Sequence, residues 1–135
     1  MIVPDASIVA AATGNDGAAG SRCRALLRSV GEAAMPDCAD IEATAVLRKL
    51  WLAGMIGDTR FRAALEALAA LPFPRFPARP FLQRAYELRA NVSPYDAVYV
   101  ALAEALRAEL VTADRRLAAA PGIRCPVRVM PPLGA

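Results

Sequence analysis

The stretch 91–106, NVSPYDAVYVALAEAL, decides how this chain folds, because every residue in 97–103 is apolar or aromatic. A helix built from such a run has no polar face, so we expect it to be buried on nearly all sides. Asp96 lies at the beginning of the run, where an ionised carboxylate is costly to bury alone. The sequence therefore predicts a buried central helix whose first turn carries an acidic group in need of a partner.

Short apolar segments lie on both sides of this helix and alternate with further helical patterns. This alternation predicts an α/β domain with a mainly parallel central sheet flanked by helices on both faces. The length of 135 residues suits a single domain, 1–135. We expect strands at 1–4, 33–35, 72–77, 110–112 and 127–130, and helices at 7–12, 21–30, 41–54, 58–71, 80–90 and 93–106, with a short helix after 114.

Three local features accompany these elements. The segment 13–20 carries Gly, Asn and Asp, which predicts a loop. Either Asp37 or Asp40 is expected to cap the helix that follows it. The helix at 58–71 is amphipathic, and its apolar stripe forms either ordinary core or the lining of a groove for a partner. The stripe consists of Phe61, Leu65, Leu68 and Leu71.

The residue types that are missing exclude several kinds of chemistry. The chain has no histidine, which removes Ser-His-Asp and Cys-His catalysis and most zinc, copper and iron sites. No glycine-rich nucleotide-binding motif is present. Catalysis would therefore have to use carboxylates, hydroxyls or arginines. We also expect no signal peptide and no membrane span, and three reduced cysteines typical of a cytoplasmic protein.

The basic residues are almost all arginines, because Lys49 is the single lysine among sixteen basic side chains. The formal net charge is +3. Arginine matches phosphate oxygens well, so a polyanionic partner is one interpretation. A GC-rich genome is the other, and net charge alone does not choose between them. A hydrophobic fraction of 56% is high and is consistent with apolar surface covered by a partner.

Four acidic residues from distant segments are predicted to meet at one edge of the sheet. Asp5 and Asp114 each follow a predicted strand, and the carboxyl ends of parallel strands share an edge. The helix that Asp96 opens runs directly into the strand 110–112, so Asp96 comes to the same side. Glu42 lies in the first turns of the helix after the second strand, which is again that edge. Clustered carboxylates repel one another, and a divalent cation with hard oxygen ligands would remove the repulsion.

Each acid also has an explanation that needs no metal. Ser93 and Asp96 fit a capping box, with Asp96 at its fourth position. Glu42 suits the positive end of a helix dipole, and Asp114 suits a helix N-cap. Asp5 is the hardest to explain in this way, because it follows an apolar strand and has no cationic neighbour in the sequence. Capping and metal binding both remain open from spacing alone.

Four motifs follow one another along the chain: I-V-x-D-x-S at 2–7, the Pro-Asp…Glu run at 36–42, S-P-Y-D-A-V-Y-V-A-L-A at 93–103 and L-V-T-A-D-R-R-L at 110–117. In this order, and over nearly the whole chain, they resemble a PIN domain of the VapC toxin type. The last two motifs are the most specific. One departure is Pro4, where the family usually has an apolar strand residue, and proline cannot donate to a sheet ladder. Pro4 therefore puts in question how the first strand pairs next to Asp5.

The resemblance implies a metal-dependent endoribonuclease that acts as the toxin of a type II toxin–antitoxin pair. Its four acids would bind Mg²⁺ or Mn²⁺, and hydroxyls would stand beside them. The expected partners are an RNA substrate, a VapB-like antitoxin and a second copy of the chain, with no membrane involved. Matched to this sequence, the acids are Asp5, Glu42, Asp96 and Asp114, and the hydroxyls are Ser7 and Thr112.

The chemistry expected of this set is metal-assisted hydrolysis of a phosphodiester bond. Arginines near the site motifs would contact flanking phosphates, and the candidates are Arg89, Arg115 and Arg116.

Two competing classes are a catalytically silent PIN-like binding module and a receiver-like signalling domain. The presence of all four acids argues against the first class. The second class needs a lysine on a late strand, whereas Lys49 lies in an early helix.

Overall fold

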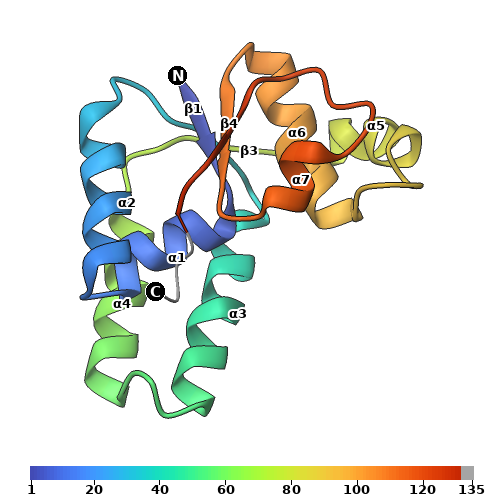
Figure 1. Ribbon diagram of the computed structural model, residues 1–135. Helices are drawn as coiled ribbons and strands as arrows, with labels where there is room; N and C mark the ends of the chain where they lie inside the picture. Colours follow the sequence, from blue (N-terminus) through green and yellow to red (C-terminus); the bar gives the residue numbers. More distant parts are fainter. Residues whose placement is uncertain (132–135) are drawn as a thin grey trace.

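The computed structural model describes residues 1–131, and its elements follow the predicted alternation closely (Figure 1). The strands are β1 (Ile2–Pro4), β2 (Met35–Pro36), β3 (Arg75–Phe76), β4 (Glu109–Thr112) and β5 (Val127–Val129). The α-helices are α1 (Ala6–Gly14), α2 (Ala18–Ser29), α3 (Ala39–Leu52), α4 (Asp58–Ala70), α5 (Leu82–Glu87), α6 (Pro94–Leu106) and α7 (Arg115–Ala119), and a short 3₁₀ turn, η1 (Arg79–Phe81), precedes α5.

The central sheet is parallel, with strand order β1-β4-β5. β2 and β3 form a separate parallel pair, which a single bridge from Ile2 to Ala33 connects to β1. Pro4 is the last residue of β1 and lies opposite Val111, and the next backbone N–H, that of Asp5, donates to the Val111 carbonyl at 2.9 Å. The proline therefore leaves the pairing beside Asp5 intact.

Helices cover both faces of the sheet, as the sequence predicts. Ile2 and Val111 pack in a cluster with residues of α1 and α2. Their neighbours Val3 and Leu110 pack instead in the larger core cluster, which contains the buried side of α6. Alternate strand residues thus point to opposite faces. In Figure 1, α3 and α4 extend away from the sheet as an antiparallel pair, while α5 lies on the other side of α6.

The prediction of a fully buried helix is confirmed for α6, because every residue in 97–103 is buried. Ser93 caps its start, where the hydroxyl accepts a hydrogen bond from the Asp96 backbone N–H at 3.2 Å. Arg107 ends the helix in the left-handed region, with φ at 53°. These two caps fix where the helix starts beneath the sheet edge and where it turns into β4.

Two local predictions are wrong. The loop expected at 13–20 is much shorter, because α1 continues to Gly14 and α2 begins at Ala18. Asn15 makes this short connection, since its side-chain oxygen accepts from the Gly17 and Gly20 N–H groups. The expected side-chain cap of α3 is also absent. Asp37 accepts from the Ala78 N–H instead, and Asp40 pairs with Arg75 at 3.1 Å.

The apolar stripe of α4 belongs mainly to the core. Leu68 is buried, and Phe61, Leu65 and Leu71 are partly buried against the main cluster.

Cys23, Cys38 and Cys125 are free thiols, as predicted. Within residues 1–131, no helix is both long enough and apolar enough to cross a membrane.

Candidate active site

Asp5 stands directly after β1 and caps the start of α1. One carboxylate oxygen, Oδ1, accepts from the Ser7 hydroxyl at 2.6 Å and from the Ile8 backbone N–H at 3.2 Å. The other, Oδ2, accepts from the Thr112 hydroxyl at 2.5 Å. The residue is only 7% exposed. Burial raises its pKa, while the hydrogen bonds from Ser7 and Thr112 act in the opposite direction.

Thr112 connects Asp5 to the turn that carries Asp114. This threonine ends β4 and is fully buried. Its hydroxyl donates to Asp5 and also accepts from the Asp114 backbone N–H at 3.0 Å. Asp114 caps α7, because its Oδ1 accepts from the Arg116 backbone N–H at 2.9 Å. The helix-cap interpretation of Asp114 is therefore correct, and it holds the carboxylate at the carboxyl end of β4.

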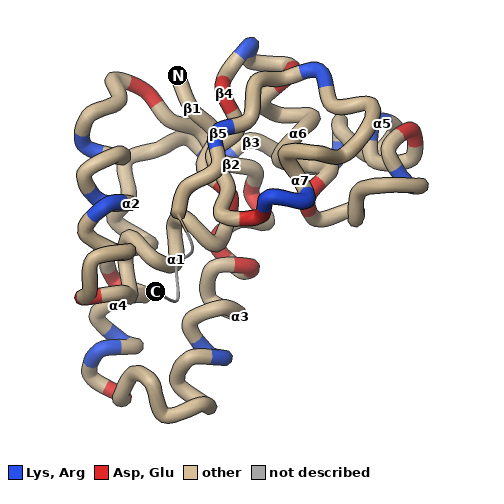
Figure 2. The backbone as a smooth tube through the Cα atoms, in the orientation of Figure 1, with Lys and Arg blue, Asp and Glu red and all other residues tan. Residues whose placement is uncertain are grey.

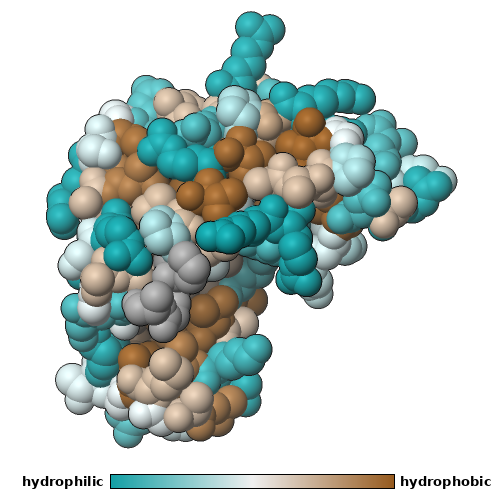
Figure 3. Space-filling view, viewed as in Figure 1, coloured by the Kyte–Doolittle hydropathy of each residue, from teal (hydrophilic) through white to brown (hydrophobic). Residues whose placement is uncertain are grey.

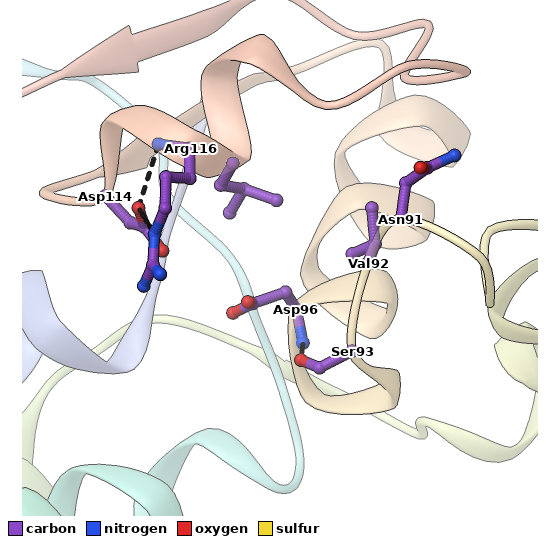
Figure 4. Close-up of a pocket in the computed structure, with 7 residues that line it drawn as sticks. Asn91, Val92, Ser93, Asp96, Asp114 and Arg116 are labelled. Carbon is purple, nitrogen blue, oxygen red and sulfur yellow. Dashed lines mark hydrogen bonds and ion pairs between the residues drawn. The ribbon is translucent and has the colours of Figure 1, made fainter.

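Asp96 faces the same edge from the first turn of α6. Burial raises its pKa first, and the negative charges of Asp5 and then Asp114 raise it further. In Figure 4 the Asp96 carboxylate points across a cavity toward the start of α7, where Asp114 and Arg116 lie. This cavity has a volume of about 230 Å³. It is lined by Asn91, Val92, Ser93, Asp96, Asp114, Arg116 and Leu117.

Glu42 is the fourth acid and projects from α3. Burial raises its pKa, and the charges of Asp96 and Asp5 add to the increase. The Cys38 thiol and the Tyr99 hydroxyl lie close enough to lower it in part. Even so, Glu42 Oε1 is buried and has no hydrogen-bond partner among the described residues. A buried carboxylate oxygen in this condition is uncommon and calls for a ligand or a nearby donor.

The negative charges of these acids act on one another. Asp5 raises the pKa of both Glu42 and Asp96, and Asp114 raises that of Asp96. The tube view shows acidic segments from the starts of α1, α3, α6 and α7 gathering below the sheet, next to the basic start of α7 (Figure 2).

The donors present are the hard oxygens that Mg²⁺ and Mn²⁺ prefer. In the part of the chain that the structure describes, no three of these side chains lie close enough together to form a ready ligand set. The unsatisfied Glu42 Oε1 and the raised pKa values both fit a cluster that lacks a compensating positive charge.

The three candidate arginines occupy different places. Arg116 lines the acidic cavity, and its side chain is 93% exposed. Arg115 borders a neighbouring hollow beside Met130. Arg89 lies over the Tyr86 ring, 4.0 Å from its centroid, and donates to the Tyr86 carbonyl. Arg116 is thus the candidate of these three that stands beside Asp96 and Asp114.

Sequence reasoning missed three residues around the acids. Asn91 lines the cavity just before the cap of α6. Cys38 is the N-cap residue of α3 and precedes Glu42 by four positions, and Tyr99 follows Asp96 by three residues on α6. Helical spacing from the two predicted acids was the signal that could have identified Cys38 and Tyr99.

Comparisons with known proteins agree with this geometry. The family model of the PIN domain matches residues 2–123. VapC ribonuclease Mb0985 of Mycobacterium bovis is 42% identical over 131 residues, covering 97% of this chain and 99% of that protein. Ribonuclease VapC1 of Mycobacterium tuberculosis is 42% identical over 130 residues, covering 95% of this chain and 96% of that protein. The crystal structure of PAE2754 from Pyrobaculum aerophilum superposes with a TM-score of 0.61 at 23% identity, covering 90% of this chain and 86% of that one, which shows a shared fold.

Proposed function

This chain belongs to the PIN-domain family and, within it, to the VapC ribonucleases, and from that premise we propose that it is the endoribonuclease toxin of a VapBC-like toxin–antitoxin pair. The reaction is hydrolysis of RNA phosphodiester bonds. The observations that support the proposal are that Asp96 and Asp114 line one cavity, and that the charge of Asp5 raises the pKa of both Glu42 and Asp96.

Mg²⁺ or Mn²⁺ is the proposed cofactor, and Asp5 and Asp96 are its main ligands, with Glu42 and Asp114 as further ligands. Such a cation, when bound, stabilises negative charge on the phosphate and activates a water for attack. The chain itself fixes the ligands in place. Ser7 and Thr112 orient both oxygens of Asp5, and the N-cap of α7 holds Asp114. The hydrogen bonds to Asp5 and Asp114 limit the movement of these two ligands before substrate arrives.

Arg116 is the residue proposed to contact the RNA backbone. Its side chain is exposed and stands on the wall of the cavity, 3.5 Å from Asp114 at its Nε. A guanidinium in this position would bind a phosphate next to the one that is cleaved, while Asp114 keeps it oriented. Arg89 and Arg115 remain candidates for phosphates farther along the strand.

The partners beyond RNA are a VapB-like antitoxin and a second copy of the chain. Apolar side chains are exposed near the end of the α3–α4 pair, including Leu52 and Met55, the latter 71% exposed. Figure 3 shows apolar surface over this pair of helices. Such surface is typical of regions that a partner covers. A homodimer would give twice the monomer mass of 14.3 kDa in light scattering. The cytoplasm, where RNA and free thiols coexist, is the proposed location.

The decisive test is cleavage by purified protein. The wild-type chain, Asp5→Asn and Asp96→Asn are incubated with total bacterial RNA in millimolar Mg²⁺ or Mn²⁺, and new 5′ ends are mapped. Removing either ligand is expected to reduce cleavage at least 100-fold, about the upper effect expected for a group that holds a metal ligand. Chelation should abolish cleavage by the wild-type chain.

The matched control is Asp16→Asn, which makes the same chemical change at a side chain that is 75% exposed and paired with Arg60 away from the cavity. This variant should cleave like the wild type. Full cleavage by folded Asp96→Asn, or full wild-type cleavage in excess chelator, would refute the proposed function.

A further inference from the structure

A buried hydroxyl group lies beneath the acidic cluster. Tyr99 is 1% exposed, and it sits on the inner side of α6 one turn after Asp96. Its hydroxyl oxygen has no hydrogen-bond partner within residues 1–131. Buried tyrosine O–H groups usually find an acceptor, because burying a hydroxyl without one is unfavourable. Phenylalanine would fill the same space without that penalty, so the hydroxyl needs an explanation other than packing.

The complementary group is the carboxylate of Glu42. Glu42 Oε1 is the other buried side-chain oxygen that lacks a partner in the described residues. Glu42 and Tyr99 are close enough that the phenol lowers the pKa of Glu42, although they do not meet hydrogen-bond geometry. The Tyr99 hydroxyl is a donor and the Glu42 carboxylate is an acceptor, and both atoms are buried near the acidic residues of the site.

The charged groups that act on the Tyr99 hydroxyl are the acids of the candidate site. Burial raises the pKa of Tyr99, and the negative charges of Glu42, Asp5 and Asp96 raise it further. At neutral pH the phenol is therefore a donor and stays protonated. Cys38 is held in the same state, because burial and Glu42 raise the pKa of its thiol to about 12. Glu42 is thus close to two protonated groups, the thiol at the N-cap of its own helix and the phenol on α6.

We propose that Tyr99 is a positioning residue of this site, whose hydroxyl donates to the Glu42 carboxylate and aims it at Asp5 and Asp96 when the cluster binds its cation. A glutamate side chain has enough rotatable bonds to close the remaining gap without backbone movement. The inference rests on the proposed metal-dependent function. The proposed hydrogen bond connects the buried helix α6 to Glu42 on α3. Helix α6 then supplies both a metal ligand, Asp96, and a residue that positions a second ligand, Tyr99.

The direct test uses Tyr99→Phe, which removes one oxygen. Metal-stripped protein is titrated with Mn²⁺ by calorimetry, and cleavage is measured over a range of Mn²⁺ concentrations. Mn²⁺ binding should weaken 10- to 100-fold, roughly the range for losing the hydrogen bond that orients a metal ligand. The thermal midpoint of the metal-free protein should stay the same or rise. The matched control is Tyr86→Phe, at a side chain 58% exposed on α5, which should bind Mn²⁺ like the wild type. Unchanged Mn²⁺ binding by Tyr99→Phe would overturn the proposal.

A second arm asks whether Tyr99 acts through Glu42. If it does, Tyr99→Phe combined with Glu42→Gln should bind Mn²⁺ no more weakly than Glu42→Gln alone. Fully additive losses would mean that the tyrosine acts on something else, and the proposal would fail.

A third measurement remains informative even if Tyr99→Phe does not fold. In proton NMR of the wild-type chain with millimolar Mg²⁺, a slowly exchanging Tyr99 hydroxyl resonance is expected, and Glu42→Gln should shift or remove it. Absence of that resonance, or its indifference to Glu42→Gln, would overturn the positioning role. The RNA cleavage of wild type and Asp96→Asn is read separately, so failure of the positioning role is distinguishable from failure of the nuclease proposal.

Discussion

Thr112 is the side chain on which the site geometry depends most directly. It is fully buried, and its one hydroxyl serves both Asp5 and the backbone of Asp114. A single oxygen atom therefore holds the Asp5 carboxylate and the backbone of the turn that carries Asp114, near opposite ends of the chain. The hydrogen bond to Asp5 also opposes the unfavourable burial of that carboxylate. Loss of the hydroxyl would leave a buried acceptor and a backbone donor unsatisfied at the same time.

We predict that Thr112→Val, which keeps the side-chain shape, lowers the free energy of unfolding by about 1–3 kcal/mol. Urea unfolding followed by circular dichroism measures this change. RNA cleavage should also fall, because Asp5 loses one of its orienting donors. The matched control is Thr13→Val, whose hydroxyl bonds only to carbonyls within α1. If both variants lose the same stability and neither loses activity, Thr112 has no special role.

The hydrophobic pattern locates the acids but not the groups that hold them. Strand ends and a helix start are visible in that pattern, which is enough to assign Asp5, Asp96 and Asp114 to one edge of the sheet. The hydroxyl of Thr112 joins residues 107 positions apart, and no local pattern carries that information. Tyr99 is hidden for another reason, because an aromatic residue inside an apolar run has the pattern of ordinary core.

The helix α6 shows what its own pattern does and does not determine. Its burial follows from seven consecutive residues without a charged side chain, and its start follows from Ser93 and Pro94. Its end cannot be recognised in the same way. A left-handed residue that closes a helix is usually glycine, whereas this position is Arg107, with φ at 53°. The short connection between α1 and α2 escapes prediction for a similar reason, because polar residues that suggest a loop also cap helices.

We predict that Arg107→Gly raises the free energy of unfolding by about 0.5–1 kcal/mol, since glycine adopts the left-handed conformation without the steric cost that an L side chain has there. The flexibility of glycine in the unfolded chain offsets part of the gain. Chemical denaturation of the two proteins measures the difference. Arg107→Ala serves as the control and should not stabilise. A destabilised Arg107→Gly would indicate that the arginine makes contacts that outweigh its backbone strain.

Across the molecule, the acids of the site work against stability while charges elsewhere support it. Burial raises the pKa values of Asp5, Glu42 and Asp96 above their ordinary values, and the charges of neighbouring acids raise those of Glu42 and Asp96 further. Glu104 is different: burial opposes its ionisation, but Arg84 and the Arg124 N–H bond to it and lower its pKa overall. The stability that Glu104 contributes is present above its ordinary pKa of 4.5 and is lost as the pH falls through its lowered value.

The three site acids change stability with pH in the opposite direction to Glu104. Each binds its proton more tightly in the folded chain than in the unfolded chain, so stability increases as pH falls from neutral into the range between the ordinary and raised pKa values. We therefore predict that the metal-free protein has a thermal midpoint a few degrees higher near about pH 5 than at about pH 7.5. Asp96→Asn should reduce that difference, because it removes one of the repelling charges. Millimolar Mg²⁺ should also reduce or reverse it, since a bound cation favours the ionised carboxylates and stabilises only the folded chain.

Scanning calorimetry in chelator and in Mg²⁺, at both pH values, tests all three statements. A metal-free midpoint that rises steadily from about pH 5 to about pH 7.5 would mean that the acids do not repel one another, and the argument for a cation at this edge would lose its electrostatic basis.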